Sequence, residues 1–229
     1  MSEPQTSTGL DPTRAKQQAR RQFEAWATTY DRSLLHRFLF RPSYMVLMEE
    51  IGRWYEQRQP DRFHVLDVGC GTGTVVGLLA GSRWPVQAVG LDFAPSMCAQ
   101  AAGKAAALGV PGRAAFVAGD SEHLPFADAA FDLVTCSNSF HHYPHQQAVV
   151  TEMRRLLRPG GRLIIIDGFR DNVIGWFVFD VIITRVEQDV YHAPWPVMHE
   201  YFVTAGFNNI RRRKFNLWFP AFATIGDAP

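Results

Sequence analysis

The sequence predicts an α/β fold built on a doubly wound, mostly parallel β-sheet. Short apolar runs that suit buried strands alternate with longer stretches that suit helices from residue 63 onward. Three glycines lie within five residues directly after the first of these runs, in VLDVGCGTG (65–73). The chain ends with two strand-like segments that have no helix between them, and such strands must pair antiparallel.

The length and composition fit one domain. The chain has 229 residues, of which 47% are hydrophobic and 20% charged, so it can bury a sizeable core. We expect residues 1–12 to form a flexible tail and residues 13–229 to form a single domain. A formal net charge of +1 gives no electrostatic reason for nucleic-acid binding. No apolar run reaches the roughly 18 residues of a membrane-spanning helix.

Three cysteines, Cys70, Cys98 and Cys136, are far apart and lack a CxxC spacing. A disulfide framework or a zinc site is therefore not expected. No HExxH pattern is present either, and we predict no metal site. Unpaired cysteines are typical of a reducing compartment, and we expect a cytoplasmic protein.

The N-terminal part, residues 13–60, is predicted to be helical. Large apolar side chains recur there at three- and four-residue steps, at Phe23, Trp26, Tyr30 and Leu34. Pro42 predicts the start of a second helix, because proline favours the first helical turn. The segment QPDR (59–62) then ends the helical region.

Five strands and three helices follow. The expected strands are FHVLDV (63–68), VQAVGLD (86–92), AAFVAGD (114–120), FDLVTCSNSF (131–140) and RLIIIDGF (162–169). The expected helices are GTVVGLLAG (73–81), PSMCAQAAGKAAALG (95–109) and HQQAVVTEMRRLLRPGG (145–161), each closed by glycine. This alternation predicts a parallel sheet with helices on both faces.

The C-terminal part has a different pattern. Residues 173–190 are expected to be helical, and residues 196–207 to form a helix ended by Gly206. Residues 208–226 are expected to form two strands joined by a turn near Phe219 and Pro220. The run RRRK (211–214) falls on the first of them, so its side chains alternate between faces, and we predict a solvated strand edge.

Gly69, Gly71 and Gly73 lie at the carboxyl end of the first strand, where open parallel sheets bind ligands. Three glycines exceed what a tight strand-to-helix turn needs, and a residue without Cβ lets a ligand approach the backbone. The dinucleotide fingerprint GxGxxG is matched imperfectly, because Thr74 occupies its third glycine position. No GxxxxGK[ST] stretch is present, which excludes a P-loop.

Two carboxylates follow the next strands. Asp92 ends the second strand, where a carboxylate accepts hydrogen bonds from both hydroxyls of a ribose. An N-cap role for Asp92 before Pro95 is compatible with this function. Asp120 ends the third strand and is placed to reach the exocyclic amine of an adenine. NAD fits this pattern, and so does any other adenosine-containing ligand.

The order and spacing of four segments resemble those of class I S-adenosylmethionine-dependent methyltransferases, and most of all the ubiquinone/menaquinone-biosynthesis-type small-molecule group. The segments are VLDVGCGTG (65–73), GLDFAPSM (90–97), AGDSEHLPFADAAFDLVTCSNSFHHYP (118–144) and EMRRLLRPGGRLIIID (152–167). The resemblance covers residues 23–167. It implies a Rossmann-like sheet of seven strands with an antiparallel last strand, S-adenosyl-L-methionine as cofactor, and methyl transfer by in-line displacement.

The resemblance also implies the roles of individual residues. Asp67 and the loop from Gly69 to Gly73, including Cys70, surround the methionine part of the cofactor. Asp92 holds the ribose, and Asp120 accepts from the adenine amine beside the Ser121 backbone. The remaining cofactor contacts that it implies are Tyr30 as a lid residue, Phe93 and Met97 on the adenine faces, and Asn138 near the methionine end. Phe93 and Met97 also suit a plain core.

Two histidines follow the fourth strand, in SFHHYPH (139–145). His141 and His142 are the best candidates for a general base, because histidine titrates near neutral pH. A base is needed only where the acceptor must lose a proton. The alternative is that the pair caps the next helix or lines the pocket wall.

The methyl acceptor is expected to contact the segments outside the shared core. These are the helical lid of residues 13–60 and a helical substrate-cap insertion after the fifth strand, residues 168–205. Both are rich in large apolar side chains, which indicates an apolar, aromatic or lipid-like small molecule. The run LLHRFLFRP (34–42) also suits peripheral membrane contact and a phospholipid N-methyltransferase.

Two other classes of function remain open from the sequence. An NAD-dependent oxidoreductase is disfavoured by Thr74 and by the terminal strand pair. A non-catalytic cofactor-binding protein is disfavoured by the intact carboxylates and glycines. The stretch SNSFHHYPHQQ (137–147) differs from the usual quinone-pathway version, so the sequence predicts the chemistry of the family without assigning that pathway.

Overall fold

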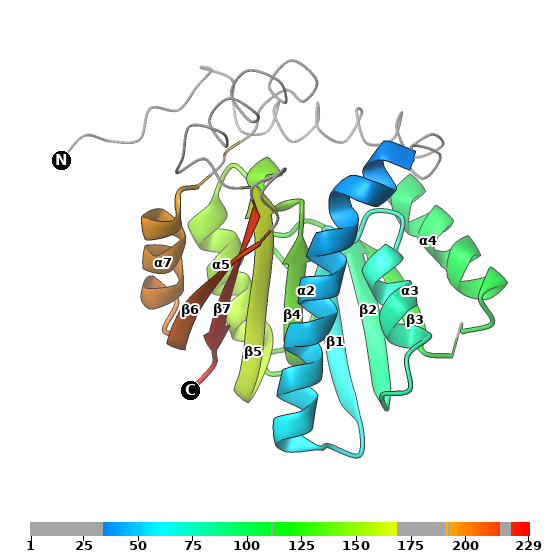
Figure 1. The fold of residues 1–229 in the computed structure, drawn as a ribbon, viewed down its shortest axis with the longest axis horizontal. Coiled ribbons are helices and arrows are strands. Elements are labelled where there is room, and N and C mark those ends of the chain that lie inside the picture. The colour runs from blue at the N-terminus through cyan, green and yellow to red at the C-terminus, as the bar shows by residue number, and fades with distance from the viewer. Residues whose placement is uncertain (1–33, 111, 169–190, 192, 216–220) are drawn as a thin grey trace.

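The computed structural model describes residues 34–110, 112–168, 191, 193–215 and 221–229 (Figure 1). The helices are α2 (Leu34–Arg58), α3 (Thr74–Ala80), α4 (Pro95–Ala107), the 3₁₀ turn η2 (Phe140–His142), α5 (Gln146–Leu156) and α7 (Trp195–Thr204). The strands are β1 (Phe63–Val68), β2 (Val86–Asp92), β3 (Ala114–Ala118), β4 (Phe131–Ser137), β5 (Leu157–Gly168), β6 (Asn208–Phe215) and β7 (Ala221–Asp227).

The strands form one seven-stranded sheet in the order β3-β2-β1-β4-β5-β7-β6. Strands β1 to β5 pair in parallel, and β7 is inserted antiparallel between β5 and β6. The terminal hairpin places β7 there because β6 and β7 are joined without a crossover helix. The predicted doubly wound, mostly parallel sheet with an antiparallel last strand is confirmed.

One face of the sheet is covered by α2, α3 and α4. Buried side chains of α2, among them Leu47, Ile51 and Trp54, pack with α3 and the inner residues of β1 in one cluster. Helix α4 packs against β2, β3 and α3. Figure 1 shows α2 lying across the front of the sheet, with α3 beside it.

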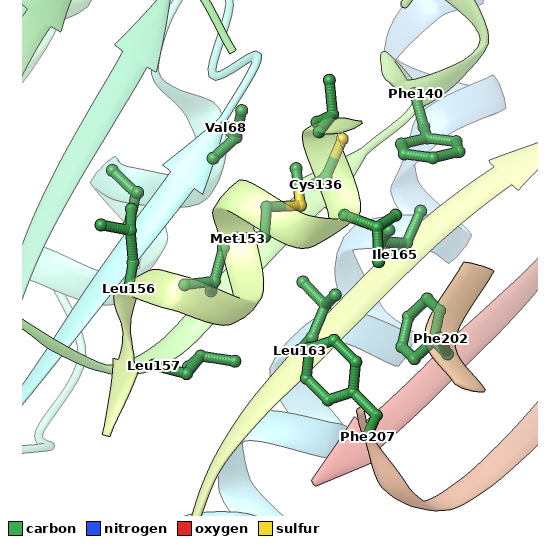
Figure 2. Close-up of a cluster of buried hydrophobic side chains, with 14 of the residues drawn as sticks. Val68, Cys136, Phe140, Met153, Leu156, Leu157, Leu163, Ile165, Phe202 and Phe207 are labelled. Atoms are coloured by element: carbon green, nitrogen blue, oxygen red, sulfur yellow. The ribbon is translucent and has the colours of Figure 1, made fainter. Parts of the chain in front are cut away.

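The opposite face is covered by α5 and α7. In α5 the buried apolar residues Val149, Val150, Met153 and Leu156 follow helical spacing. Figure 2 shows Met153 and Leu156 packed toward Val68, Cys136, Leu163 and Ile165 of the sheet, with Phe202 and Phe207 extending the cluster beneath α7. The sheet is therefore buried on both faces, as its apolar strands require.

The prediction for Pro42 is wrong. Helix α2 runs from Leu34 to Arg58 with Pro42 inside it, so no new helix begins there. Proline removes one main-chain hydrogen bond and costs about 3 kcal/mol in a helix interior. Burial of Val46, Leu47 and Ile51 against the sheet offsets that cost, since each buried side chain of this size contributes roughly 1.5–3 kcal/mol.

Three strand boundaries differ from expectation. β3 ends at Ala118 and β4 at Ser137, so Asp120 and Asn138 lie in the turns beyond the strands. β5 begins five residues before Arg162, at Leu157, which pairs with Phe131 across a register shift. The helix expected at 173–190 and the turn at Phe219 and Pro220 lie outside the described residues.

The RRRK run lies on the edge strand β6, and its side chains do alternate between faces. Arg211 and Arg213 pair with Glu50 of α2, at 2.6 and 3.2 Å, and the Glu50 side chain is fully buried. Arg212 faces the other way and stacks over Trp195, 4.4 Å from its ring centroid. The prediction of a solvated strand edge is confirmed by the edge position of β6 and by the exposed Arg212, while Arg211 and Arg213 also hold α2 onto the sheet.

Candidate functional site

The carboxyl ends of β1 and β4 meet at the point where the strand order reverses. The chain proceeds from β1 to β2 on one side, and β4 is the neighbour on the other. Asp67 of β1 lies opposite Thr135 of β4 in the register. Ligands bind at such a switch point in open α/β sheets. The turns that leave β1, β2 and β4 begin at this edge.

The three loop glycines all have positive φ, but they serve three different purposes. A Cβ on Gly69 would lie 2.2 Å from Ser139 Oγ, and a Cβ on Gly73 would lie 2.7 Å from Ala101 Cβ. Both glycines therefore make room for the protein's own side chains. A Cβ on Gly71, whose φ is +51°, would meet nothing within 4 Å in the part of the chain that the structure describes. Against those residues, Gly71 alone of the three borders open space.

Asp67 is a buried carboxylate at the end of β1, with 3% of its surface exposed. Thr135 Oγ1 donates a hydrogen bond to its Oδ1 at 2.7 Å. Burial raises the pKa of Asp67 to about 7, and the negative charge of Asp92 adds to the rise while the Thr135 bond opposes it. A positive group brought next to Asp67 would favour its ionised form.

Asp92 connects the glycine loop to the start of α4. Its Oδ2 accepts from the Gly71 N–H at 2.8 Å, and its Oδ1 accepts from the Ala94 N–H at 2.9 Å. Burial raises the pKa of Asp92, and these main-chain donors oppose the rise. The carboxylate is thus fixed beside Gly71, where its remaining lone pairs can accept from a diol. The alternative N-cap role is wrong, because the N-cap of α4 is Ala94, with no side-chain cap bond, and Asp92 lies two residues before it.

The adenine-side predictions differ in exposure. Phe93 is 36% exposed, which suits a side chain that covers a ligand. Met97 is buried beside Ala94, so its plain core role is supported as well. Asp120 and Ser121 are half-buried in the turn after β3, where Asp120 Oδ1 accepts from the Glu122 N–H at 3.0 Å. The Cys70 side chain lies in the core next to Gly90, so only its main chain remains to contact a ligand.

The turn after β4 is held to α2 and to β5. Asn138 has φ +56°, a left-handed conformation that asparagine tolerates better than most residues. Its Oδ1 accepts from Ser43 Oγ of α2 at 3.2 Å, and its Nδ2 donates to Ser137 Oγ at 2.9 Å. Its main-chain N–H donates to the Ile166 carbonyl at 2.8 Å. These bonds hold the Asn138 turn to α2, β4 and β5 at the switch point.

His141 and His142 follow in η2, and their ring centroids are 4.1 Å apart. His141 is buried, and its Nδ1 lies 2.6 Å from Asp167 Oδ1. His142 is half-buried. Tyr30, the predicted lid residue, lies outside the described residues.

Asp167 is a site residue that the sequence reasoning missed. It is a buried carboxylate at the end of the apolar strand β5, in IIIDG. A charge that ends an otherwise apolar strand was the available signal, because buried carboxylates need partners. Its partner, His141, is 26 residues away in the sequence.

These residues fit a ligand that carries positive charge. Asp67 and Asp92 are close enough for the charge of one to raise the pKa of the other. Within the described residues, no lysine or arginine is paired with either carboxylate. The ammonium and sulfonium groups of S-adenosylmethionine would bring positive charge next to these carboxylates, whereas the pyrophosphate of NAD would be repelled.

The chain is similar to known methyltransferases. Residues 66–165 match the family model described as a methyltransferase domain. A demethylmenaquinone methyltransferase of Lactiplantibacillus plantarum is 29% identical over 174 residues, which is 67% of this chain and 73% of that protein. A phthiotriol/phenolphthiotriol dimycocerosates methyltransferase of Mycobacterium leprae is 34% identical over 54% of this chain, which spans 44% of that relative.

Solved structures share the fold. The magnesium protoporphyrin IX methyltransferase of Synechocystis PCC 6803, solved with bound SAH, has a TM-score of 0.73 at 17% identity, covering 93% of this chain and 100% of that one. In the part of the chain that the structure describes, no helix has the length and hydrophobicity to cross a membrane. The same part holds no group of three or more histidine, cysteine or acidic side chains arranged around a metal position.

Proposed function

Because this chain is a class I S-adenosylmethionine-dependent methyltransferase, we propose that it methylates a small, lipid-like acceptor at the carboxyl edge of its sheet. The observation that carries the proposal is that, among the described residues, nothing lies within 4 Å of a Cβ on Gly71, whose N–H donates to Asp92. Several curated relatives bear names of the same substrate type, among them a sterol 4-C-methyltransferase of Caenorhabditis elegans and a tocopherol O-methyltransferase of Arabidopsis thaliana.

In this proposal the cofactor supplies an electrophilic methyl group on a sulfonium, which leaves as a neutral thioether. The chain binds and orients the reactants. Asp92 accepts from the ribose hydroxyls, Asp67 faces the positively charged methionine part, and Asn138 borders it. Phe93 covers the adenine and Asp120 accepts from its amine. Such positioning supplies most of the rate enhancement when the leaving group is already good.

The acceptor side begins at η2, where His141 or His142 takes a proton from an acceptor hydroxyl. We propose residues 13–60 and 168–205 as the acceptor lid and cap, which leaves much of the acceptor pocket outside the described residues. A phenol or quinol needs such a base, and a tertiary or secondary amine does not. A phospholipid amine acting at a membrane surface is the second candidate, suggested by the run 34–42.

We propose the cytoplasm as the location, in keeping with three free, buried cysteines. We propose no nucleic-acid partner, because the arginines of β6 are engaged within the protein. Arg211 and Arg213 pair with Glu50, and Arg213 also pairs with Glu49 at 2.6 Å.

The first test is calorimetric titration of the full chain with S-adenosylhomocysteine, with NADH in parallel. We expect S-adenosylhomocysteine alone to bind. Asp92→Ala should weaken that binding by a few kcal/mol, because charge-assisted hydrogen bonds are lost, whereas Asp61→Ala, in the exposed turn before β1, should not. Binding of NADH alone, or unchanged affinity in Asp92→Ala, would overturn the cofactor assignment.

The second test is a screen for the acceptor. Radiolabelled methyl transfer from S-adenosylmethionine would be measured with quinols, phenols, amines and phospholipid vesicles. Transfer to a phenol or quinol supports the first candidate. Transfer to vesicles of phosphatidylethanolamine, and not to soluble phenols, supports the phospholipid reading in its place.

A further inference from the structure

We infer that Cys70 and Cys98 form a peroxide-sensitive thiol pair, and that a disulfide between them weakens cofactor binding. Cys70 lies in the glycine loop after β1, and Cys98 lies in the first turn of α4. The formation of the disulfide is independent of the proposed function, whereas its effect on the cofactor rests on that function.

The two thiols meet on the face of the sheet that α3 and α4 cover. Cys70 Sγ lies over β2, where it would be 2.7 Å from a Cβ on Gly90. Cys98 Sγ lies 3.4 Å from the Val117 carbonyl oxygen of β3 and 4.0 Å from the Asp92 carbonyl oxygen of β2. The side chains of Cys70 and Cys98 are hydrogen-bonded to each other, so no other side chain separates their sulfur atoms.

A groove between α4 and β3 gives access to Cys98. It has a volume of about 360 Å³, and its described walls are Cys98, the ring of Phe116 and alanines of the two elements. Cys70 and Cys98 each keep 8% of their surface exposed, whereas Cys136 keeps none. Against the described residues, a small oxidant can therefore reach the pair, and Cys136 is enclosed in the core.

Cys98 is the more reactive thiol of the pair. Its hydrogen bond with Cys70 lowers the pKa of Cys98, although burial and the charge of Asp92 oppose this. The same hydrogen bond, together with burial, raises the pKa of Cys70. Because the thiolate is the nucleophile toward peroxide, Cys98 should react first and Cys70 should then attack the oxidised sulfur.

Hydrogen peroxide is the oxidant in this reaction. The Cys98 thiolate attacks one peroxide oxygen, an S–O bond forms, the O–O bond breaks, and the departing hydroxide takes up the proton that Cys98 had released. Cys70 then attacks the Cys98 sulfur, the S–O bond breaks, and the Cys70 proton leaves with the hydroxide as water. Two thiols and one peroxide thus give one disulfide and two waters. The sulfurs are oxidised and the peroxide is reduced by two electrons.

The disulfide would act on the main chain beside Cys70. A disulfide holds its two sulfur atoms at about 2.05 Å. Two hydrogen-bonded thiols are farther apart, so Cys70 and α4 must move toward each other. Gly71 is the next residue in the loop, and its N–H donates to Asp92 at 2.8 Å. The movement would therefore displace Gly71 and the carboxylate that is proposed to bind the ribose.

A peptide map tests the disulfide without reference to activity. The full chain would be reduced, freed of reductant, treated with a small excess of hydrogen peroxide, alkylated under denaturing conditions and digested with trypsin. Cleavage at Arg83 places Cys70 and Cys98 on different peptides, so their disulfide appears as a joined pair. We expect that pair in protein that runs as a monomer on a non-reducing gel, with Cys136 alkylated. No joined pair, a crosslink between two chains, or a crosslink to Cys136 would overturn the inference.

Calorimetry with S-adenosylhomocysteine tests the effect on the cofactor site. The oxidised wild type should bind at least tenfold more weakly than the reduced protein, and dithiothreitol should restore the affinity. Cys98→Ser should bind like the reduced wild type before and after peroxide, because serine can donate to the Val117 carbonyl but cannot form a disulfide. Cys136→Ser is the matched control, a buried free cysteine outside the pair, and it should keep both the crosslink and the loss of affinity.

The outcomes separate the inference from the proposed function. If the reduced protein fails to bind S-adenosylhomocysteine, the cofactor assignment is refuted, while the peptide map still decides whether the thiol pair forms a disulfide. If the disulfide forms and the affinity changes less than twofold, the regulatory effect is refuted and the proposed function stands. If peroxide weakens binding to Cys98→Ser as much as to the wild type, oxidation acts at another residue and the inference is wrong.

Discussion

Replacing Asp67 by asparagine should stabilise the protein in the absence of cofactor. The carboxylate is buried beside Thr135, and its pKa rises from 3.8 to about 7 because burial disfavours the charge. Asparagine has nearly the same shape, keeps an oxygen for the Thr135 hydroxyl, and carries no charge at any pH. Asp67 would therefore lower the free energy of unfolding of the cofactor-free protein, and its role would be to bind a ligand.

The magnitude follows from proton linkage. The unfolded chain releases the Asp67 proton near pH 3.8 and the folded chain near pH 7. Between these values the folded state binds more protons, so the stability of the wild type falls as pH rises, by about 1.4 kcal/mol for each pH unit. Asp67→Asn does not share this loss. Its advantage should grow from near zero at pH 4 to about 4 kcal/mol at pH 7, and then stay level.

Urea unfolding at pH 5, 6, 7 and 8 tests this reasoning. The two proteins should have equal m-values and midpoints that diverge as pH rises, with the larger stability for Asp67→Asn. Asp61→Asn, in the exposed turn before β1, is the control and should match the wild type throughout. A stability difference that is absent, or that does not change with pH, would refute the argument from burial.

Three further predictions concern the same edge and the packing behind it. Affinity for S-adenosylhomocysteine should increase from pH 6 to 8, because its ammonium favours ionised Asp67, and calorimetry of Asp67→Asn should give a flat profile. Gly73→Ala should lower the free energy of unfolding, measured with urea, by about 2–4 kcal/mol, since its Cβ would lie 2.7 Å from Ala101 Cβ. Gly71→Ala should lower it by only about 1 kcal/mol, through backbone strain, and should weaken cofactor binding. Glu50→Gln should lower the free energy of unfolding by about 1–3 kcal/mol. This is less than the loss of a fully buried ion pair, because the Arg211 and Arg213 side chains are 42% and 30% exposed. Glu49→Gln is the control and should change the urea midpoint little.

The loop of Gly69, Gly71 and Gly73 shows what the local sequence pattern could predict and what it could not. Its position after a buried strand predicted a place at the carboxyl edge of the sheet, and the structure places the loop there, because parallel strands bring their carboxyl ends to one side. That a ligand binds there stays a prediction. The expectation that all three glycines make room for a ligand is wrong for Gly69 and Gly73 and stays a prediction for Gly71. Gly69 and Gly73 are required by Ser139, Ala101 and Phe116, which lie far away in the sequence.

The sequence by itself determined the strands, the helices and the carboxylates that end the strands, because hydrophobic period and covalent order are local properties. Only the tertiary structure decided which distant groups meet. Asp167 and His141 are 26 residues apart, and Glu50 and Arg211 are 161 apart, so their pairing depends on strand order and on the packing of α2. Packing also carries α2 through Pro42 against its local preference, since burial over the whole sheet face outweighs one missing hydrogen bond.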